Sequence, residues 1–237
     1  MQLFYAQPQD LLTDLYTLPE DESHHVAKVM RMHAGDTLWL TDGRGTRLCA
    51  TIVQPDPRGC LVRIVERQPH AEMSSTLRVA VAPTKNEGRL EWFAEKATEV
   101  GIGAITPALC DRSERTTLRT DRLEKIVVSA MKQSLHLVKP RVDSLLPLDD
   151  IVTQATETQR LICHCEGTER TPLRTAMRPG VPTLILIGPE GDFSPREVAL
   201  AKAHGFVPVS LGDSRLRTET AALAAVFYAS FVNQPPR

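Results

Sequence analysis

Two glycine-containing segments hold the residues of this sequence that are best suited to chemistry. Each follows a short apolar run: Ile187-Gly-Pro-Glu-Gly191 follows Thr183-Leu-Ile-Leu, and Leu211-Gly212 follows Val207-Pro-Val-Ser. Glycine permits backbone conformations that are closed to other residues and lets a ligand approach the chain closely. Backbone N–H and C=O groups in such loops could recognise a flat heterocycle, and two such loops can meet at the carboxyl edge of a parallel sheet.

The alternative is that both segments are tight strand-to-helix turns without a ligand. Neither contains the Gly-x-Gly-x-x-Gly pattern or a P-loop, which are the usual signs of dinucleotide and nucleotide sites. A small-molecule oxidoreductase is therefore disfavoured.

A short run, Cys163-His164-Cys165, raises the question of a metal site. On a strand the two cysteines would face one side and the histidine the other, and no second ligand pair has suitable spacing. We therefore expect no metal.

Basic side chains gather in two stretches, one in the first 70 residues and one after residue 76. His25, Lys28 and Arg31 lie on or near one short predicted helix, and Arg112 and Arg115 open the densest basic stretch of the later part. The formal net charge is only −1, whereas proteins that bind nucleic acids through phosphates are usually basic. Any RNA contact must therefore come from such local groups; simple solvation of these side chains is the alternative.

The elements that would position these residues indicate two domains in an α/β chain. Residues 1–70 contain short strand-like runs, a hairpin signal at Asp42-Gly-Arg-Gly45 and one short helix over 19–31, which suggests a compact barrel. Residues 68–75 read as a linker. Over 76–237 strands and helices alternate, which predicts a largely parallel sheet. Ser194, Pro195 and Glu197 form a capping box that starts a helix.

Composition sets broad limits. The 237 residues are 42% hydrophobic, which is ordinary for a globular protein. No apolar run approaches the ~20 residues of a membrane helix, and the N-terminus has no signal-peptide pattern. Five cysteines without framework spacing fit reduced thiols in a cytoplasm.

Taken together, Ile187-Gly-Pro-Glu-Gly191 and Leu211-Gly-(x)3-Leu-Arg-Thr-Glu-Thr-Ala221 resemble the SPOUT class of S-adenosylmethionine-dependent RNA methyltransferases. Within that class the chain resembles the RsmE family, which methylates N3 of a uridine in 16S ribosomal RNA. The stretch His25–Asp36, and Lys85 followed by Glu95–Gly101, also resemble the family, so the resemblance covers nearly the whole chain.

The resemblance implies a PUA-like RNA-binding β-barrel followed by a SPOUT domain with a C-terminal trefoil knot. It also implies a homodimer acting on 16S rRNA of the small ribosomal subunit in the cytoplasm, without metal or membrane. The residues expected to hold S-adenosylmethionine are Ile187, Gly188, Glu190, Gly191, Leu211, Gly212, Leu216 and Thr220.

Two residues are candidates for the chemistry of N3 methylation. Arg217 could favour the imide anion by donating to a uracil carbonyl, and Glu219 could act as a general base. The alternatives are an ion pair of Arg217 with Glu219 or Glu190, and a helix-dipole role for Glu219. A non-catalytic RNA-binding or assembly factor with the same fold is a further alternative. Loss of the loop glycines or of Arg217 would support it, and all of these residues are present.

The sequence departs from the family pattern at two places. Asp192 stands where glycine is common, and Lys132-Gln-Ser-Leu-His136 stands where Glu-Gln, a small residue and arginine are common. The second departure concerns the substrate-side residues. A SPOUT enzyme that acts elsewhere, at a ribose 2′-hydroxyl or on tRNA, is the nearest alternative, and the Leu-Arg-Thr-Glu-Thr-Ala motif and the predicted barrel argue against it.

Overall fold

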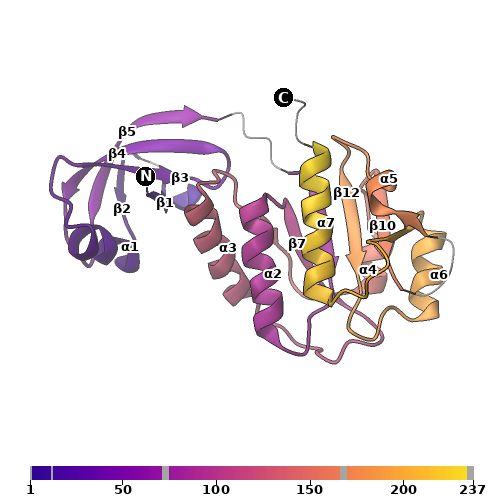
Figure 1. The fold of residues 1–237 in the computed structure, drawn as a ribbon. Helices are drawn as coiled ribbons and strands as arrows, with labels where there is room; N and C mark the ends of the chain where they lie inside the picture. Colours follow the sequence, from indigo (N-terminus) through magenta and orange to yellow (C-terminus); the bar gives the residue numbers. More distant parts are fainter. Residues whose placement is uncertain (1, 12, 71–74, 166–169, 234–237) are drawn as a thin grey trace. The chain divides into compact units, whose positions relative to one another are not determined.

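The computed structural model describes residues 2–11, 13–70, 75–165 and 170–233. These divide into two compact units, shown by the ribbon in Figure 1. The first unit comprises Met1–Ser74 together with Val128–Lys139, and the second comprises Ser75–Val127 together with Pro140–Arg237. The sequence pattern predicted domains over 1–70 and 76–237 and gave no sign that residues 128–139 pack with the first unit.

The first unit is built on a mixed five-stranded sheet in the order β1-β3-β4-β5-β2. β1 pairs with β3 in parallel, and the remaining neighbours are antiparallel. The predicted hairpin is confirmed, because the Asp42 carboxylate accepts from the backbone N–H groups of Arg44 and Thr46. The strands are β1 (Leu3–Tyr5), β2 (Leu15–Thr17), β3 (Thr37–Thr41), β4 (Thr46–Gln54) and β5 (Leu61–Pro69).

One face of this sheet is closed by the predicted short helix. It consists of α1 (Glu20–His24) and a π-helical turn, η2 (His25–Val29), preceded by the 3₁₀ turn η1 (Pro8–Asp10). Ser23 anchors it, since its buried hydroxyl donates to the Leu18 carbonyl at 2.9 Å and accepts from the Cys60 N–H at 2.8 Å.

The segment 128–139 joins the first unit through hydrogen bonds to the hairpin turn. Leu137 accepts at its carbonyl from the Thr41 hydroxyl at 2.8 Å and from the Gly45 N–H at 3.0 Å. The Lys139 N–H donates to the Gly43 carbonyl at 2.8 Å. These contacts span about a hundred positions of sequence, so no local pattern could indicate them.

The second unit is an eight-stranded sheet whose pairings are all parallel, as the strand–helix alternation predicted. The order is β11-β13-β10-β12-β6-β7-β8, with β9 beside β7. The strands are β6 (Leu77–Val81), β7 (Ala104–Leu109), β8 (Arg141–Val142), β9 (Leu146–Pro147), β10 (Gln159–Cys163), β11 (Thr171–Pro172), β12 (Thr183–Ile187) and β13 (Val207–Ser210).

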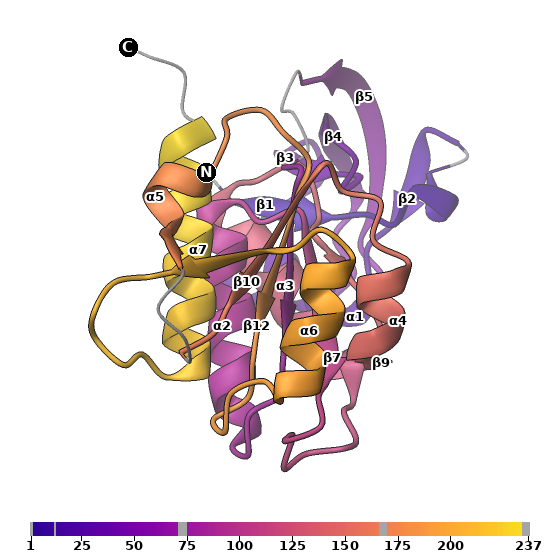
Figure 2. The ribbon, with the colours of Figure 1, turned by 90° about the vertical axis from the view of Figure 1, so that its right-hand side faces the viewer.

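Helices cover both faces of this sheet. The helices of this unit are α2 (Glu87–Val100), α4 (Leu148–Thr153), α5 (Leu173–Ala176), α6 (Pro195–Ala203) and α7 (Thr218–Asn233). The helix α3 (Thr120–Ser134) begins in this unit, and its residues from Val128 onward belong to the first unit. Figure 2 shows α2 and α7 on one side of the strands and α4 and α6 on the other. The residues of β12 alternate accordingly: Ile185 and Ile187 pack with α2 and α7, whereas Leu184 and Leu186 pack with α4 and α6.

The predicted α6 cap is confirmed. Ser194 accepts from the Glu197 N–H, and the Glu197 carboxylate accepts from the Ser194 N–H, while Pro195 occupies the first turn. Within the described ranges no helix is long and apolar enough to cross a membrane.

Candidate active site

Three strands of the second unit end side by side at one edge of the sheet. Ile187, the last residue of β12, lies opposite Val81 at the end of β6 and opposite Cys163 at the end of β10. Cys163 in turn lies opposite Val209 of β13. Because these strands are parallel, the loops that follow them emerge together at the carboxyl edge, where open α/β sheets bind ligands.

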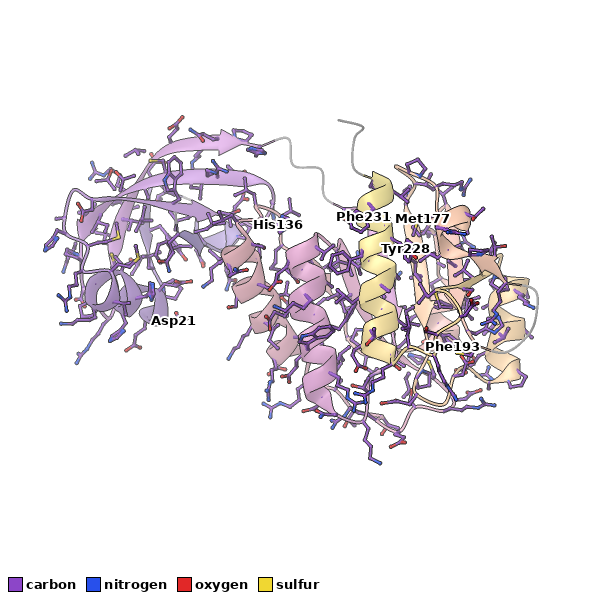
Figure 3. All side chains as sticks on the ribbon, in the orientation of Figure 1. Asp21, His136, Met177, Phe193, Tyr228 and Phe231 are labelled. Carbon is purple, nitrogen blue, oxygen red and sulfur yellow. The ribbon has the colours of Figure 1, made fainter. Side chains whose placement is uncertain are left out.

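The loop after β12 is held down by Phe193. A Cβ atom placed on Gly188 would lie 3.1 Å from the Phe193 ring, which is tighter than ordinary packing. Phe193, labelled in Figure 3, is itself buried in the core shared with α4 and α6. Glycine at position 188 therefore lets the loop lie flat against the sheet before α6 begins.

In the loop after β13, Gly212 has open space around it, whereas Gly188 is crowded by Phe193. The Gly212 φ of +120° suits glycine alone, and no atom lies within 4 Å of the position that a Cβ would occupy. The backbone at Gly212 therefore faces open space, as a surface that receives a ligand must.

Thr218 joins the two loops. Its buried hydroxyl donates to the Gly188 carbonyl at 3.1 Å, and Thr218 is also the first residue of α7. This contact fixes the start of α7 beside the loop after β12.

Two adjoining pockets open between these loops. The smaller holds about 300 Å³ and the larger about 510 Å³, volumes within the range of small-molecule sites. They share a wall formed by Cys163, Cys165, Arg215, Leu216 and Ala221.

Six of the eight residues predicted to hold the cofactor line these pockets. They are Ile187, Gly188, Glu190 and Leu216 in the smaller pocket, and Leu211, Gly212 and again Leu216 in the larger. Gly191 and Thr220 line neither. The Gly191 carbonyl accepts from Arg112 Nη1 at 2.8 Å, and Thr220 is exposed on the first turn of α7.

The two candidates for chemistry lie at the start of α7 in different surroundings. Arg217 is exposed and lines the smaller pocket. Glu219 is only 8% exposed, and its Oε1 lies 3.8 Å from Arg89 Nε on α2. Glu190 accepts from the backbone N–H of Lys85 at 3.3 Å. The carboxylates considered as ion-pair partners of Arg217 thus contact other groups, and Arg89 is a residue that the sequence analysis missed.

Arg112 and Arg115 follow β7 and lie beside the same edge. Arg112 holds the Gly191 carbonyl, as described above, whereas Arg115 contacts Glu87 and donates to the Lys85 carbonyl at 3.4 Å. The basic stretch predicted from sequence is therefore adjacent to the loop after β12.

The α6 cap fixes the position of this basic stretch. The buried Glu197 carboxylate accepts from the Asp111 N–H at 2.8 Å, and Arg196 bridges Asp111 and Asp149 at 2.7 Å each. Hydrogen bonds from Arg196 and Ser194 lower the pKa of Asp111 below its usual value, so this carboxylate stays charged at neutral pH.

Three further predicted residues belong to the first unit. His25 hydrogen-bonds Gln2 at 2.7 Å and packs edge-on against Phe4. Lys28 lines an open hollow next to α1, and the exposed Arg31 has a φ of +54° just after the π-helical turn. These side chains share one region of their own unit.

The Cys163-His164-Cys165 run lies in the wall of the pockets. All three residues line the larger pocket. Burial raises the pKa of the Cys163 thiol to about 12, so that thiol stays protonated. Across the described ranges no group of three or more His, Cys, Asp and Glu side chains is placed to hold a metal ion.

Known families match both units. Residues 71–230 match an RNA methyltransferase domain, and residues 18–65 match an RNA methyltransferase PUA domain. The ribosomal RNA small subunit methyltransferase E of Mycobacterium tuberculosis is 32% identical, over 94% of this chain and 89% of its own length. The protein of the same name from Bacillus subtilis is 27% identical, over 91% and 90%.

Solved structures agree. The structure of a probable rRNA methyltransferase from Porphyromonas gingivalis is 39% identical in sequence, with a TM-score of 0.91 and 98% of each chain covered. A Legionella pneumophila protein, solved with its bound cofactor SAM (S-adenosylmethionine), is 28% identical, with a TM-score of 0.84 and the same coverage. The chain therefore belongs to the RNA methyltransferase family of ribosomal RNA small subunit methyltransferase E, the RsmE family.

Proposed function

We propose that this protein transfers a methyl group from S-adenosylmethionine to N3 of a uridine in 16S rRNA of the small ribosomal subunit. Membership of the RsmE family supports the reaction class and the substrate. The observation that carries the proposal is the pair of adjoining pockets between two glycine loops, which the Thr218–Gly188 hydrogen bond joins. The Legionella relative, which binds S-adenosylmethionine, supports the cofactor.

The chemistry of the pocket lining suits this cofactor. Gly212 offers open backbone, and Ile187, Leu211 and Leu216 supply apolar surface for an adenine ring. Glu190 and the carbonyls of the loops supply acceptors for hydroxyl and amino groups. S-adenosylmethionine, when bound, supplies a methyl group on a positively charged sulfur.

Arg217 and Glu219 are the residues that we assign to the substrate side. Uridine N3 carries a proton at neutral pH, and that proton must leave as the N–C bond forms. Arg217, exposed beside the smaller pocket, donates to a uracil carbonyl and so stabilises the negative charge that develops. Glu219, whose carboxylate lies against Arg89 at the same helix start but lines neither pocket, is the candidate acceptor of the proton.

RNA binding requires local positive charge, because the whole chain carries a net charge of −1. Arg112 and Arg115 lie beside the loop after β12, where they can contact phosphates next to the target nucleotide. His25, Lys28 and Arg31 provide a second contact region on the PUA-like unit, which we propose to be a barrel.

We further propose a homodimer in the cytoplasm, with a trefoil knot in the second unit. The family resemblance supports all three features. The five cysteines, which form no disulfide, also fit a reducing compartment. An exposed aromatic patch on α7, formed by Phe227, Tyr228 and Phe231, supports the dimer, since large exposed apolar groups mark interaction surfaces.

The test is to incubate the protein with methyl-labelled S-adenosylmethionine and small ribosomal subunits that lack the modification. The RNA is then digested and the labelled nucleoside identified. N3-methyluridine supports the proposal. Label in a ribose methyl group would indicate a SPOUT enzyme with a different target, and cofactor binding without label would favour a non-catalytic assembly factor. The Gly212→Val variant serves as the cofactor-binding control.

A further inference from the structure

One carboxylate links two walls of the proposed cofactor site. Asp192 belongs to the loop after β12 and lines the smaller pocket. Its Oδ2 accepts a hydrogen bond from the Cys165 N–H at 2.8 Å, and its Oδ1 accepts from the N–H of the adjacent Phe193 at 2.8 Å. Cys165 follows β10, so the first of these bonds connects the ends of two neighbouring strands.

The backbone conformation at position 192 is one that glycine adopts most easily. Asp192 has a φ of +62°, and its N–H donates to the Pro189 carbonyl at 2.9 Å in a tight turn. Glycine adopts this left-handed conformation without strain, whereas a residue with a Cβ does so at some cost. The two hydrogen bonds of the carboxylate give the side chain at this position a role that glycine could not supply.

The contact that reaches furthest is the bond to Cys165. Cys165 and Cys163 line both pockets, so the position of the Cys165 backbone sets the shape of the shared wall. Phe193, whose backbone N–H donates the second bond, is buried under Gly188 and labelled in Figure 3. The carboxylate thus ties a loop end that is anchored in the core to a loop end that is exposed.

We infer that Asp192 is a positioning residue for S-adenosylmethionine, because its carboxylate holds the Cys165 backbone at the spacing that the bound cofactor requires. The inference rests on the proposed function. It assigns Asp192 no contact with the reacting atoms, since it acts through the wall of the pocket.

Two substitutions separate the carboxylate from the backbone conformation. Asp192→Gly removes the acceptor and relieves the strain at positive φ, so it should leave the melting temperature unchanged or raise it. Asp192→Asn tolerates the same conformation and keeps one side-chain oxygen as an acceptor. Asp56→Gly is the matched control, because Asp56 accepts from the Arg58 N–H in an exposed turn of the first unit.

The first measurement is residue-resolved hydrogen exchange at the Cys165 amide in the free protein. The second is the dissociation constant for S-adenosylmethionine by calorimetry. In Asp192→Gly we expect exchange at least ten times faster and affinity about tenfold weaker, equivalent to ~1.4 kcal/mol, without loss of melting temperature. Asp192→Asn should fall between this variant and the wild type, and Asp56→Gly should match the wild type.

Wild-type exchange and affinity in Asp192→Gly would overturn the inference. So would a weaker affinity that accompanies a matching fall in melting temperature in both Asp192 variants, since that pattern describes general destabilisation. If the wild type itself failed to bind S-adenosylmethionine, the proposed function would be overturned instead. The exchange data, recorded without cofactor, would still show whether Asp192 holds the Cys165 backbone.

Discussion

Gly212 lines the larger pocket and has a backbone conformation that suits glycine alone. Its φ of +120° and the open space around it mean that any side chain would both strain the loop and enter the pocket. A variant at this position therefore needs a control that carries the strain alone. Gly205 provides one, because it has a φ of +80°, equally open surroundings and a place in the turn between α6 and β13.

We expect Gly212→Val to lose S-adenosylmethionine binding, because the valine side chain would occupy the space meant for the cofactor. Gly205→Val should bind normally, and both variants should lose a similar ~1–3 kcal/mol of stability from backbone strain. Calorimetry with the cofactor and urea denaturation measure the two quantities. Undiminished binding by Gly212→Val would remove the cofactor from this loop.

Arg217 tests the assigned chemistry. Arg217→Ala should keep S-adenosylmethionine binding, because the cofactor residues are untouched, and should lower turnover by roughly 10²–10³-fold, the usual cost of losing a donor to a developing anion. Arg217→Lys keeps the charge without the planar fork and should fall between. Methylation assays under single-turnover conditions give the rates. Normal turnover in Arg217→Ala would exclude it from the mechanism.

The two glycine loops could be found from the sequence, because a strand end followed by glycine is a local signal. Six of the eight residues predicted there line the pockets. The pairing of Arg89 with Glu219 and the bond from Cys165 to Asp192 depend on which helices and loops become neighbours. The only local sign of the latter was an aspartate at a position where glycine is common.

At the scale of elements, α6 links the active-site edge to the basic stretch. Its capping box also fastens Asp111, which precedes Arg112, through the buried Glu197 carboxylate. A helix start therefore positions a candidate RNA-binding side chain. The sequence predicted the cap from four residues, whereas the link to Asp111 required the fold.

Two variants affect the cap and this link differently. Ser194→Ala removes the capping hydroxyl, together with its hydrogen bond to Asp111 Oδ2, but leaves the Glu197 carboxylate on the Asp111 N–H, and it should cost about 1 kcal/mol. Glu197→Ala leaves the N–H groups of Asp111 and Ser194 without their charged acceptor and should cost about 2–3 kcal/mol. It should also lower methylation of ribosomal subunits further than Ser194→Ala does, because Arg112 is less well fixed. Urea denaturation and turnover assays measure both effects, and equal losses in the two variants would contradict the link.

Length decided which elements could be predicted. Buried strands such as β12 and helices such as α7 contain enough residues for their pattern to be read. Strands of two or three residues, such as β2, β8, β9 and β11, have no readable period and are defined by the strands beside them. The helix α4 ends at Thr153, and Glu157, between this helix and β10, contacts Arg78.

At the scale of the whole molecule, the sequence pattern predicted domains over 1–70 and 76–237, and the division of the structure differs in its membership. The strand–helix alternation after residue 76 indicated the parallel sheet, because parallel strands require such connections. Residues 128–139 pack with the first unit instead, through bonds from Thr41 and Gly45 to Leu137. Their sequence reads only as the end of a helix, so this association depends on distant partners.

The assembly of two copies is the feature that the aromatic patch on α7 supports. Phe231 is 66% exposed and stacks on Phe227, with ring centroids 6.2 Å apart, and Tyr228 is exposed beside them. Figure 3 shows Tyr228 and Phe231 near the C-terminal end of α7. Apolar area of this kind costs ~25 cal/mol per Å² when it remains in water, so burial against a second copy would stabilise a dimer.

Phe231→Asp would place a carboxylate in that contact, where it must lose hydration without a partner. We expect the dissociation constant of the dimer to rise at least 100-fold, equivalent to about 2.7 kcal/mol. Methylation at low protein concentration should fall correspondingly. Val65→Asp is the control, since Val65 is 57% exposed on β5 of the first unit. Sedimentation velocity over a concentration series measures the association. A wild type that sediments as a monomer, or a Phe231→Asp variant that remains dimeric, would show that this patch does not join two copies.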